Sequence, residues 1–203
     1  GLTSPNYAMS YVAGDYTIVP AGQLLVKVAN ASAAYGAAGT YAISSVEYLT
    51  TNGSTLTTLT VGSSNGATYT YNDGFGGSVS FTLGATGTFT PGGALPVGNY
   101  ALTGSGLSQT GTNFSGTPIF VGNQAVTPKQ LTTTASKTYD GTRVLPAANL
   151  VLGGVLAGDT VAAAGAGAFV LTGAGAGQNY TLGGITLTGA QAANYFVDTL
   201  NPA

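Results

Sequence analysis

The side chains that could perform acid, base, nucleophile or metal chemistry are few in this sequence and far apart. None of the 203 residues is His or Cys, so Ser-His pairs, thiolate nucleophiles and His- or Cys-ligated metals have no source. The six carboxylates are dispersed at Asp15, Glu47, Asp73, Asp140, Asp159 and Asp198. Because Asp15, Asp73 and Asp140 each adjoin a Gly, turns account for them better than a glycosidase pair. We therefore expect no enzymatic activity.

Other ligand and cross-link chemistries also have weak support. Calcium loops use clusters such as Asp-x-Asp, and the sequence holds none, so Asn72-Asp73-Gly74 is predicted to be a hairpin turn. The Gly-rich run 165–177 lacks the Lys-Thr/Ser ending of a phosphate loop, and we expect a close strand approach or a loose loop there. Lys27, with Glu47 as the acid, could form an isopeptide cross-link only if it faces inward. We expect it instead to be exposed on a strand edge. The sequence thus predicts no cofactor.

The charge content is unusually low and limits the partners of this protein. Only 5% of the residues are charged, where about 25% is typical of soluble domains, so Thr, Ser, Asn and Gly must supply the polar surface. The basic residues Lys27, Lys129, Lys137 and Arg143 are scattered and form no basic stripe, which argues against nucleic acid. Apolar runs are interrupted by Gly and Thr well before about 18 residues, so no membrane insertion is expected. This composition is typical of secreted bacterial fibres and adhesins.

Alternation of apolar and polar residues predicts strands almost everywhere. Thr, Val, Tyr, Ile and Phe dominate the non-Gly positions, and their side chains fit a pleated sheet. In 24–28, Leu24, Val26 and Val28 lie on one face and Lys27 on the other, and Ser78–Leu83 keeps strict period two. We expect an all-β or mostly β fold, with short helical turns only near 146–150 and 189–194.

Turn dipeptides separate these strands. Residues that tolerate positive φ occur at Asn52-Gly53, Asn65-Gly66, Asp73-Gly74 and Asp140-Gly141, where they can close tight hairpins.

A motif recurs along the chain and defines units. Its tail combines a Leu-Thr or Leu-Ser pair with an Asn-aromatic pair, which occurs at Asn6-Tyr7, Asn113-Phe114 and Asn194-Tyr195. Its head opens with Gln-Leu: Gln23-Leu24 begins a strand expected to reach Tyr35-Gly36, and Gln130-Leu131 begins one expected to reach Tyr139-Asp140-Gly141-Thr142.

These units give the predicted domain organisation. Residues 1–21 are interpreted as the C-terminal hairpin of a preceding repeat, 22–128 as a complete repeat, and 129–203 as a repeat whose last strand is missing. With linkers of only a few residues, we expect the units to stack end to end with limited flexing. The chain is interpreted as a segment of a longer array with open strand edges at both ends.

The repeated motifs resemble a known group of bacterial sequences. The run 135–142, Ala-Ser-Lys-Thr-Tyr-Asp-Gly-Thr, is similar to the signature of the YDG repeat. The run 31–36, Ala-Ser-Ala-Ala-Tyr-Gly, together with the Asn-aromatic tails, resembles the related MBG ("mostly β-grasp") repeat. Both repeats occur in filamentous-haemagglutinin-like adhesins exported by two-partner secretion. The resemblance implies a small β-grasp-like sheet in each unit and a role in adhesion or fibre building.

Tyr139-Asp140-Gly141 could bind a ligand, but local turn chemistry accounts for all three residues. We expect Tyr139 to lie in the core of its unit, Asp140 to accept backbone N–H groups and Gly141 to supply an unusual φ.

The expected function is that of a structural and adhesive segment of a secreted, extracellular bacterial surface protein. Its partners would be neighbouring repeats or copies of the same chain, and host or bacterial surface glycans or proteins. A filament subunit joined by strand addition is the alternative. A carbohydrate-binding module is less favoured because the sequence contains no Trp.

Overall fold

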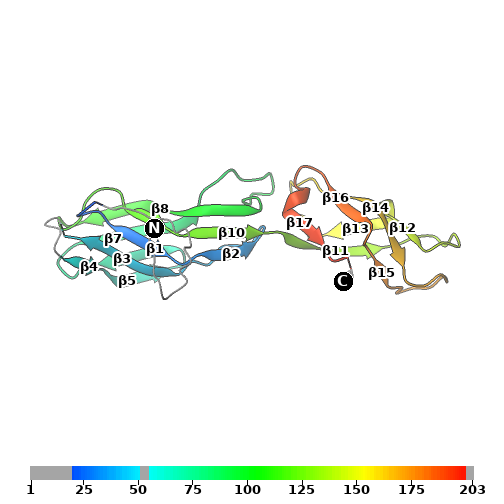
Figure 1. The fold of residues 1–203 in the computed structure, drawn as a ribbon, viewed down its shortest axis with the longest axis horizontal. Helices are drawn as coiled ribbons and strands as arrows, with labels where there is room; N and C mark the ends of the chain where they lie inside the picture. The colour runs from blue at the N-terminus through cyan, green and yellow to red at the C-terminus, as the bar shows by residue number, and fades with distance from the viewer. Residues whose placement is uncertain (1–19, 51–54, 200–203) are drawn as a thin grey trace, which may run out of the picture.

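The computed structural model describes residues 20–50 and 55–199, and these residues form an elongated, mostly β molecule (Figure 1). Two parts lie end to end: an N-terminal part, residues 22–128, and a C-terminal part, residues 129–199. All the strand ladders of the described residues fall within one part or the other. The expectation of a mostly β fold is confirmed, because the described residues contain no α-helix.

One sheet of the N-terminal part has the order β4-β3-β1-β9. Its strands are β1 (Leu25–Val28), β3 (Ile43–Leu49), β4 (Leu56–Thr58) and β9 (Ile119–Val121). β1 and β3 are antiparallel, and β9 lies parallel to β1 on its other side. The first strand of this part is therefore held between an antiparallel partner, β3, and a parallel strand from near the end of the part, β9.

The second sheet of the N-terminal part has the order β2-β10-β8-β7-β6-β5. Its strands are β2 (Ala31–Ala34), β5 (Thr60–Asn65), β6 (Thr68–Asn72), β7 (Ser78–Ala85), β8 (Gly98–Thr110) and β10 (Asn123–Thr127). Its central strands β7 and β8 are long, and β2 again pairs in parallel with a late strand, β10.

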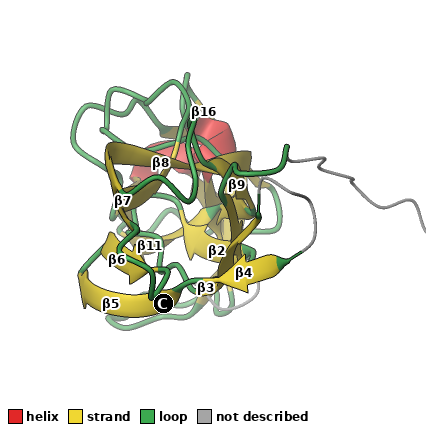
Figure 2. Ribbon diagram, turned by 90° about the vertical axis from the view of Figure 1, so that its left-hand side faces the viewer, coloured by secondary structure: helices red, strands yellow, loops and turns green. Residues whose placement is uncertain are grey.

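The two sheets of the N-terminal part enclose its core. Figure 2 shows the ribbon of these sheets along the long axis of the molecule. Val26 and Val46 from the first sheet meet Val79, Phe81 and Leu102 from the second, and all five are at most 1% exposed. Strict alternation in Ser78–Leu83 is confirmed, since every second residue of this run is buried. The predicted exposure of Lys27 is also confirmed: its side chain is 50% exposed and pairs with Glu47. Its predicted place on a strand edge is wrong, because β1 lies between β3 and β9.

Both long strands predicted to begin at the Gln-Leu pairs are wrong. The strand expected from Gln130 to Thr142 ends at Ala135, and residues 136–143 are not in a strand. The strand expected from Gln23 to Gly36 is also interrupted. It is broken after Val28, and its two halves, β1 and β2, belong to different sheets. At the break, the amide of Ala29 donates to Ala42 O in the first sheet, while the side chain of Asn30 accepts from the amide of Asn123 in the second. The chain crosses between sheets here, which alternation alone does not reveal.

The C-terminal part is built from two smaller sheets around a second core. One has the order β13-β11-β17, from β11 (Lys129–Ala135), β13 (Leu150–Gly153) and β17 (Tyr195–Val197). The other joins β12 (Val144–Pro146), β14 (Ala162–Phe169), β15 (Tyr180–Thr181) and β16 (Ile185–Thr188). β11 is antiparallel to β13 and parallel to β17, which repeats the arrangement around β1.

Short turns and glycines complete this part as the sequence predicts. Two 3-10 turns, Ala147–Asn149 and Ala192–Asn194, lie in the two predicted regions. The run 165–177 combines both expected uses of glycine. At Gly165, with φ of +88°, a Cβ would stand 2.2 Å from Gly184 O, so the strands approach closely, whereas residues 170–177 form a loop.

Replacing Phe81 by Ala should destabilise the N-terminal part by about 3–5 kcal/mol, because the fully buried ring would leave a cavity. Denaturant unfolding measures the change. The matched control is Phe75→Ala, whose ring is 77% exposed, and it should change the free energy of unfolding by less than about 0.5 kcal/mol. Equal effects of the two substitutions would contradict the described core.

Candidate functional site

The carboxylate of Asp159 lies where the two parts meet and accepts hydrogen bonds from both of them. The Tyr35 hydroxyl of the N-terminal part donates to Oδ2 at 2.6 Å, and the Tyr195 hydroxyl of the C-terminal part donates to the same oxygen at 2.7 Å. The backbone amide of Gly92, from the N-terminal part, donates to Oδ1 at 2.8 Å. We call Tyr35, Gly92, Asp159 and Tyr195 the junction cluster.

Local structure holds each member of the junction cluster in place. Tyr35 directly follows β2, and its amide donates to Thr127 O at 2.8 Å, next to the chain crossing into the C-terminal part. Asp159 follows Gly158, whose φ of +96° turns the loop between β13 and β14 toward the N-terminal part. Tyr195 is the first residue of β17 and directly follows the 3-10 turn Ala192–Asn194, and its hydroxyl accepts from the amide of Leu156 at 2.9 Å.

The two tyrosine rings of the junction cluster are buried and in contact. Tyr35 is 1% exposed and Tyr195 5% exposed, and their ring centroids lie 5.2 Å apart in an edge-to-face arrangement. Such a pair adds about 0.5–1.5 kcal/mol to the free energy of burying its area.

Proton equilibria in the cluster follow from this burial. Desolvation alone would raise the pKa of the Asp159 carboxyl, but the hydrogen bonds from Tyr35, Tyr195 and Gly92 outweigh it and lower that pKa. Desolvation and the hydrogen bond to Asp159 raise the pKa of both phenols. Asp159 is therefore held ionised and the phenols protonated, which is the state in which every hydrogen bond can form.

The loop 86–97, between β7 and β8, extends the contact between the parts. The amide of Val97 donates to Oδ1 of Asn194 at 2.8 Å, which occupies that buried side chain of the Asn-aromatic motif. Ala94 and Leu95 pack against the core of the C-terminal part, as does Val126. The core of one part is thus completed by side chains of the other.

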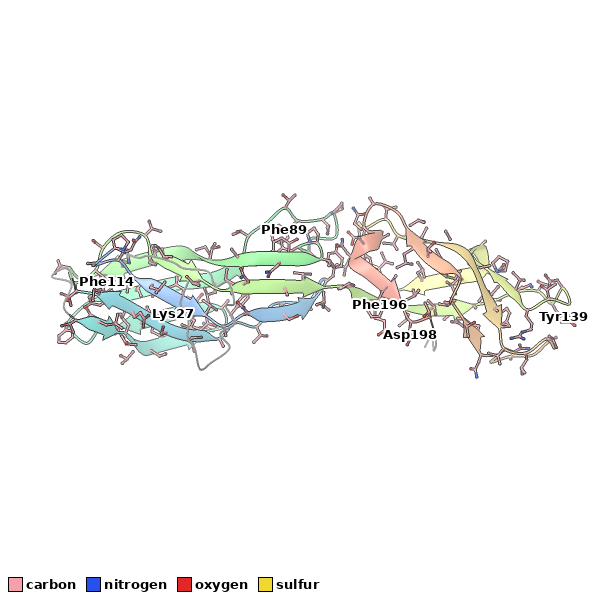
Figure 3. All side chains as sticks on the ribbon, in the orientation of Figure 1. Lys27, Phe89, Phe114, Tyr139, Phe196 and Asp198 are labelled. Atoms are coloured by element: carbon pink, nitrogen blue, oxygen red, sulfur yellow. The ribbon has the colours of Figure 1, made fainter. Side chains whose placement is uncertain are left out.

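The predicted motif residues 139–142 lie at the opposite end of the C-terminal part (Figure 3). Asp140 accepts from the amide of Thr142 at 2.9 Å and from its hydroxyl at 2.8 Å, and Gly141 has a φ of +78°, both as expected. The prediction that Tyr139 lies in the core of its unit is wrong. Its side chain is 59% exposed, because no other element of the described residues covers this end of the C-terminal part.

Lys137 stabilises the loop 136–143 between β11 and β12, which we call the distal loop. Its Nζ contacts Oδ1 of Asp140 at 2.7 Å and donates to Thr142 Oγ1 and Val144 O at 2.8 Å each. The hydrogen bond with Lys137, followed by those from Thr142, lowers the pKa of Asp140 to about 2.

A cleft of about 570 Å³ lies beside the distal loop. It is lined by residues 133–139 on one side and by the loop 171–178 on the other, with Phe169 and Tyr180 between them. The Tyr180 hydroxyl donates to Thr133 O at 2.8 Å, which fixes the inner wall.

The remaining predicted residues are placed separately. Asn113 donates through Nδ2 to Oδ2 of Asp73 at 2.7 Å, and Phe114 packs on Tyr48 in the N-terminal core. Gly36 has a φ of +80° and lies against Leu156 at the junction. Asn6 and Tyr7 lie outside the described residues.

The structure brings together two predicted motif residues, Tyr35 and Tyr195, through a carboxylate that sequence reasoning missed. Asp159 follows Gly158, so its local sequence is that of a turn. A usable signal is that Tyr195 carries a hydroxyl where Phe114, at the same place in the other unit, does not. A buried phenol generally needs a hydrogen-bond partner.

The described residues hold no group of three or more His, Cys, Asp or Glu side chains that could bind a metal. Nor do they include a helix long and apolar enough to cross a bilayer. Chemically, the Asp159 carboxylate acts as a hydrogen-bond acceptor between phenols and a backbone amide.

A comparison with known protein families finds a match that spans the C-terminal part, including the distal loop. Residues 123–202 match the YDG domain. A YDG domain is therefore present in this chain. The match begins at Asn123 and so includes β10, which pairs with β8 and β2 of the N-terminal part. No curated protein and no solved structure matches the chain.

Removing the Tyr35 hydroxyl or the Asp159 carboxylate should destabilise the protein, because each removes a hydrogen bond from desolvated polar groups. In a double-mutant cycle of Tyr35→Phe and Asp159→Ala, we expect a coupling of about 0.5–3 kcal/mol in the free energy of unfolding. Tyr180→Phe, combined with Asp159→Ala in the same kind of cycle, is the matched control. It should show no coupling, because the Tyr180 hydroxyl donates to Thr133 O instead. Additive effects of Tyr35→Phe and Asp159→Ala would contradict the cluster.

Replacing Lys137 by Met should loosen the distal loop without unfolding the protein, because the loop would lose its contacts to Asp140, Thr142 and Val144. Hydrogen exchange should show faster exchange of the Thr142 amide. Lys27→Met, which breaks an ion pair in the other part, is the control and should leave that amide unchanged.

In the unchanged protein, the contacts with Lys137 and Thr142 lower the folded pKa of Asp140 to about 2, below its unfolded value of 3.8. The stability that these contacts add should therefore be fully present above pH 3.8 and be lost as the pH falls through about 2.

Proposed function

We propose that this chain is a structural and adhesive segment of a large secreted bacterial surface protein, in which it holds successive β-modules in line. The observation that carries the proposal is the junction. Only Pro128 separates β10 from β11. The junction cluster adds hydrogen bonds from Asp159 of the C-terminal part to Tyr35 and Gly92 of the N-terminal part. A short linker and a buried polar contact together favour a stiff spacer over independently moving domains.

We infer that both parts are β-grasp-like repeats. The arrangement that supports this is a first strand flanked by an antiparallel partner on one side and by a parallel strand from near the end of the unit on the other. It occurs as β3-β1-β9 and again as β13-β11-β17. The YDG domain at residues 123–202 and the charge-poor composition favour an extracellular repeat protein with the surface-exoprotein role that the resemblance implies.

The spacer function predicts one extended shape in solution, which small-angle X-ray scattering measures. We expect a narrow distribution of overall dimensions for the unchanged chain and a broader one for Asp159→Ala, which removes the acceptor shared by both parts. Asp140→Ala, which removes a carboxylate from the distal loop, is the control and should keep the narrow distribution. A distribution that is equally broad in all three proteins would contradict a stiff spacer.

The adhesive function is tested with beads coated by the folded chain or by the heat-denatured chain. Stronger retention of the folded coating on epithelial or bacterial cells supports adhesion, and equal retention contradicts it. Ordered fibres in electron micrographs of the same preparation would contradict the spacer function and support the alternative, a filament subunit.

A further inference from the structure

The exposed Tyr139 occupies the position that the buried Tyr35 occupies in the preceding unit. Both follow the first strands of their unit in the pattern Ala-Ser-x-x-Tyr, at 31–35 and 135–139. Tyr35 lies at the end of the N-terminal part that faces the next module, and Tyr139 lies at the equivalent, outer end of the C-terminal part (Figure 3). Their exposures are 1% and 59%.

The loops beside these two tyrosines are also equivalent. The loop 86–97 leads into β8 through Asn99-Tyr100-Ala101-Leu102, and the loop 170–179 ends as β15 begins, in Asn179-Tyr180-Thr181-Leu182. Leu102 and Leu182 are both buried, at 1% and 0% exposure. The same strand therefore starts after each loop.

The equivalent loops differ in what covers them. In the first, Leu95 packs against the core of the C-terminal part. In the second, Val170 and Leu171 are exposed at 46% and 63%, and Leu171 lines the cleft next to Tyr139.

The turn glycines show the same contrast. A Cβ on Gly36 would meet Leu156 of the following module at 2.8 Å, whereas a Cβ on Gly141 has nothing within 4 Å among the described residues. Tyrosine, loop and turn thus form one surface twice, once covered by a module and once exposed.

We propose that the distal surface, residues 137–142 and 170–178, is a docking surface for a further β-module of the same kind as residues 129–199. The incoming module presents a carboxylate to the Tyr139 hydroxyl, as Asp159 does to Tyr35, and an apolar side chain to Leu171. This inference rests on the proposed spacer function and specifies its partner. Burial of Tyr139, Val170 and Leu171 supplies the apolar centre of the contact, and the shared carboxylate sets its orientation.

The test extends the full chain with a second copy of residues 129–203 and follows nitration of individual tyrosines by mass spectrometry. In the unextended chain Tyr139 should react fast and Tyr35 slowly. In the extended chain we expect Tyr139 nitration to slow by about tenfold or more, since a tenfold change needs only about 1.4 kcal/mol of docking free energy. Asp159→Ala in the second copy alone should restore fast nitration, and Asp140→Ala in that copy is the matched control that should not.

Two results would overturn the docking surface. One is fast nitration of Tyr139 while hydrogen exchange shows that the second copy is folded, both with a direct connection and with a flexible Gly-Ser linker. The other is a slowed Tyr139 that Asp159→Ala in the second copy leaves slow. Tyr35 in the same samples reports on the existing junction: fast Tyr35 nitration would contradict the spacer function itself, whereas slow Tyr35 with fast Tyr139 would contradict the docking surface alone.

Discussion

The arrangement of the two parts depends on one ionised carboxylate that is shared between them. Asp159 accepts hydrogen bonds from Tyr35, Tyr195 and the amide of Gly92, so it is satisfied by both parts at once. A carboxylate withdrawn from water is costly unless it is hydrogen-bonded, and charge-assisted bonds are stronger than neutral ones. Separating the parts would remove the charged acceptor from the Tyr35 hydroxyl and leave it only the neutral hydroxyl of Thr90. The contact is therefore directional, which an apolar patch alone would not be.

Within the six-stranded sheet of the N-terminal part, neutral hydroxyl pairs connect neighbouring strands. On the exposed face of the N-terminal part, hydroxyls meet across strands: Thr68 with Thr82 at 2.8 Å, Thr70 with Ser80 at 2.6 Å, and Ser78 with Thr110 at 2.7 Å. Cross-strand hydroxyl pairs each contribute roughly 0.2–1 kcal/mol, and they do not weaken with salt as ion pairs do. This explains how the sheets tolerate a surface with so little charge.

The parallel pairing of an early and a late strand sets the direction in which the chain runs through each part. β1 pairs in parallel with β9, where Leu25 lies opposite Ile119. β11 pairs in parallel with β17, where Lys129 lies opposite Tyr195, more than 60 residues further along the chain. Because these strands run in the same direction, the chain enters a part at one end and its late strand runs toward the other, so the second part begins at the far end of the first (Figure 1).

The sequence by itself determined the features that depend on neighbours along the chain. Alternation placed Leu24, Val26 and Val28 inward, and the Asn65-Gly66 and Asp140-Gly141 pairs marked turns, because side-chain direction in a strand and positive φ are local properties. It could not decide the break between β1 and β2 or the role of Asp159, since both depend on residues about 90 or more positions away, such as Asn123 for Asn30 and Tyr35 for Asp159. Tyr35 and Tyr139 show the limit most directly. The two stand in the same local pattern, yet one is buried and the other exposed, because burial depends on what packs against a side chain, and only the tertiary structure determines that.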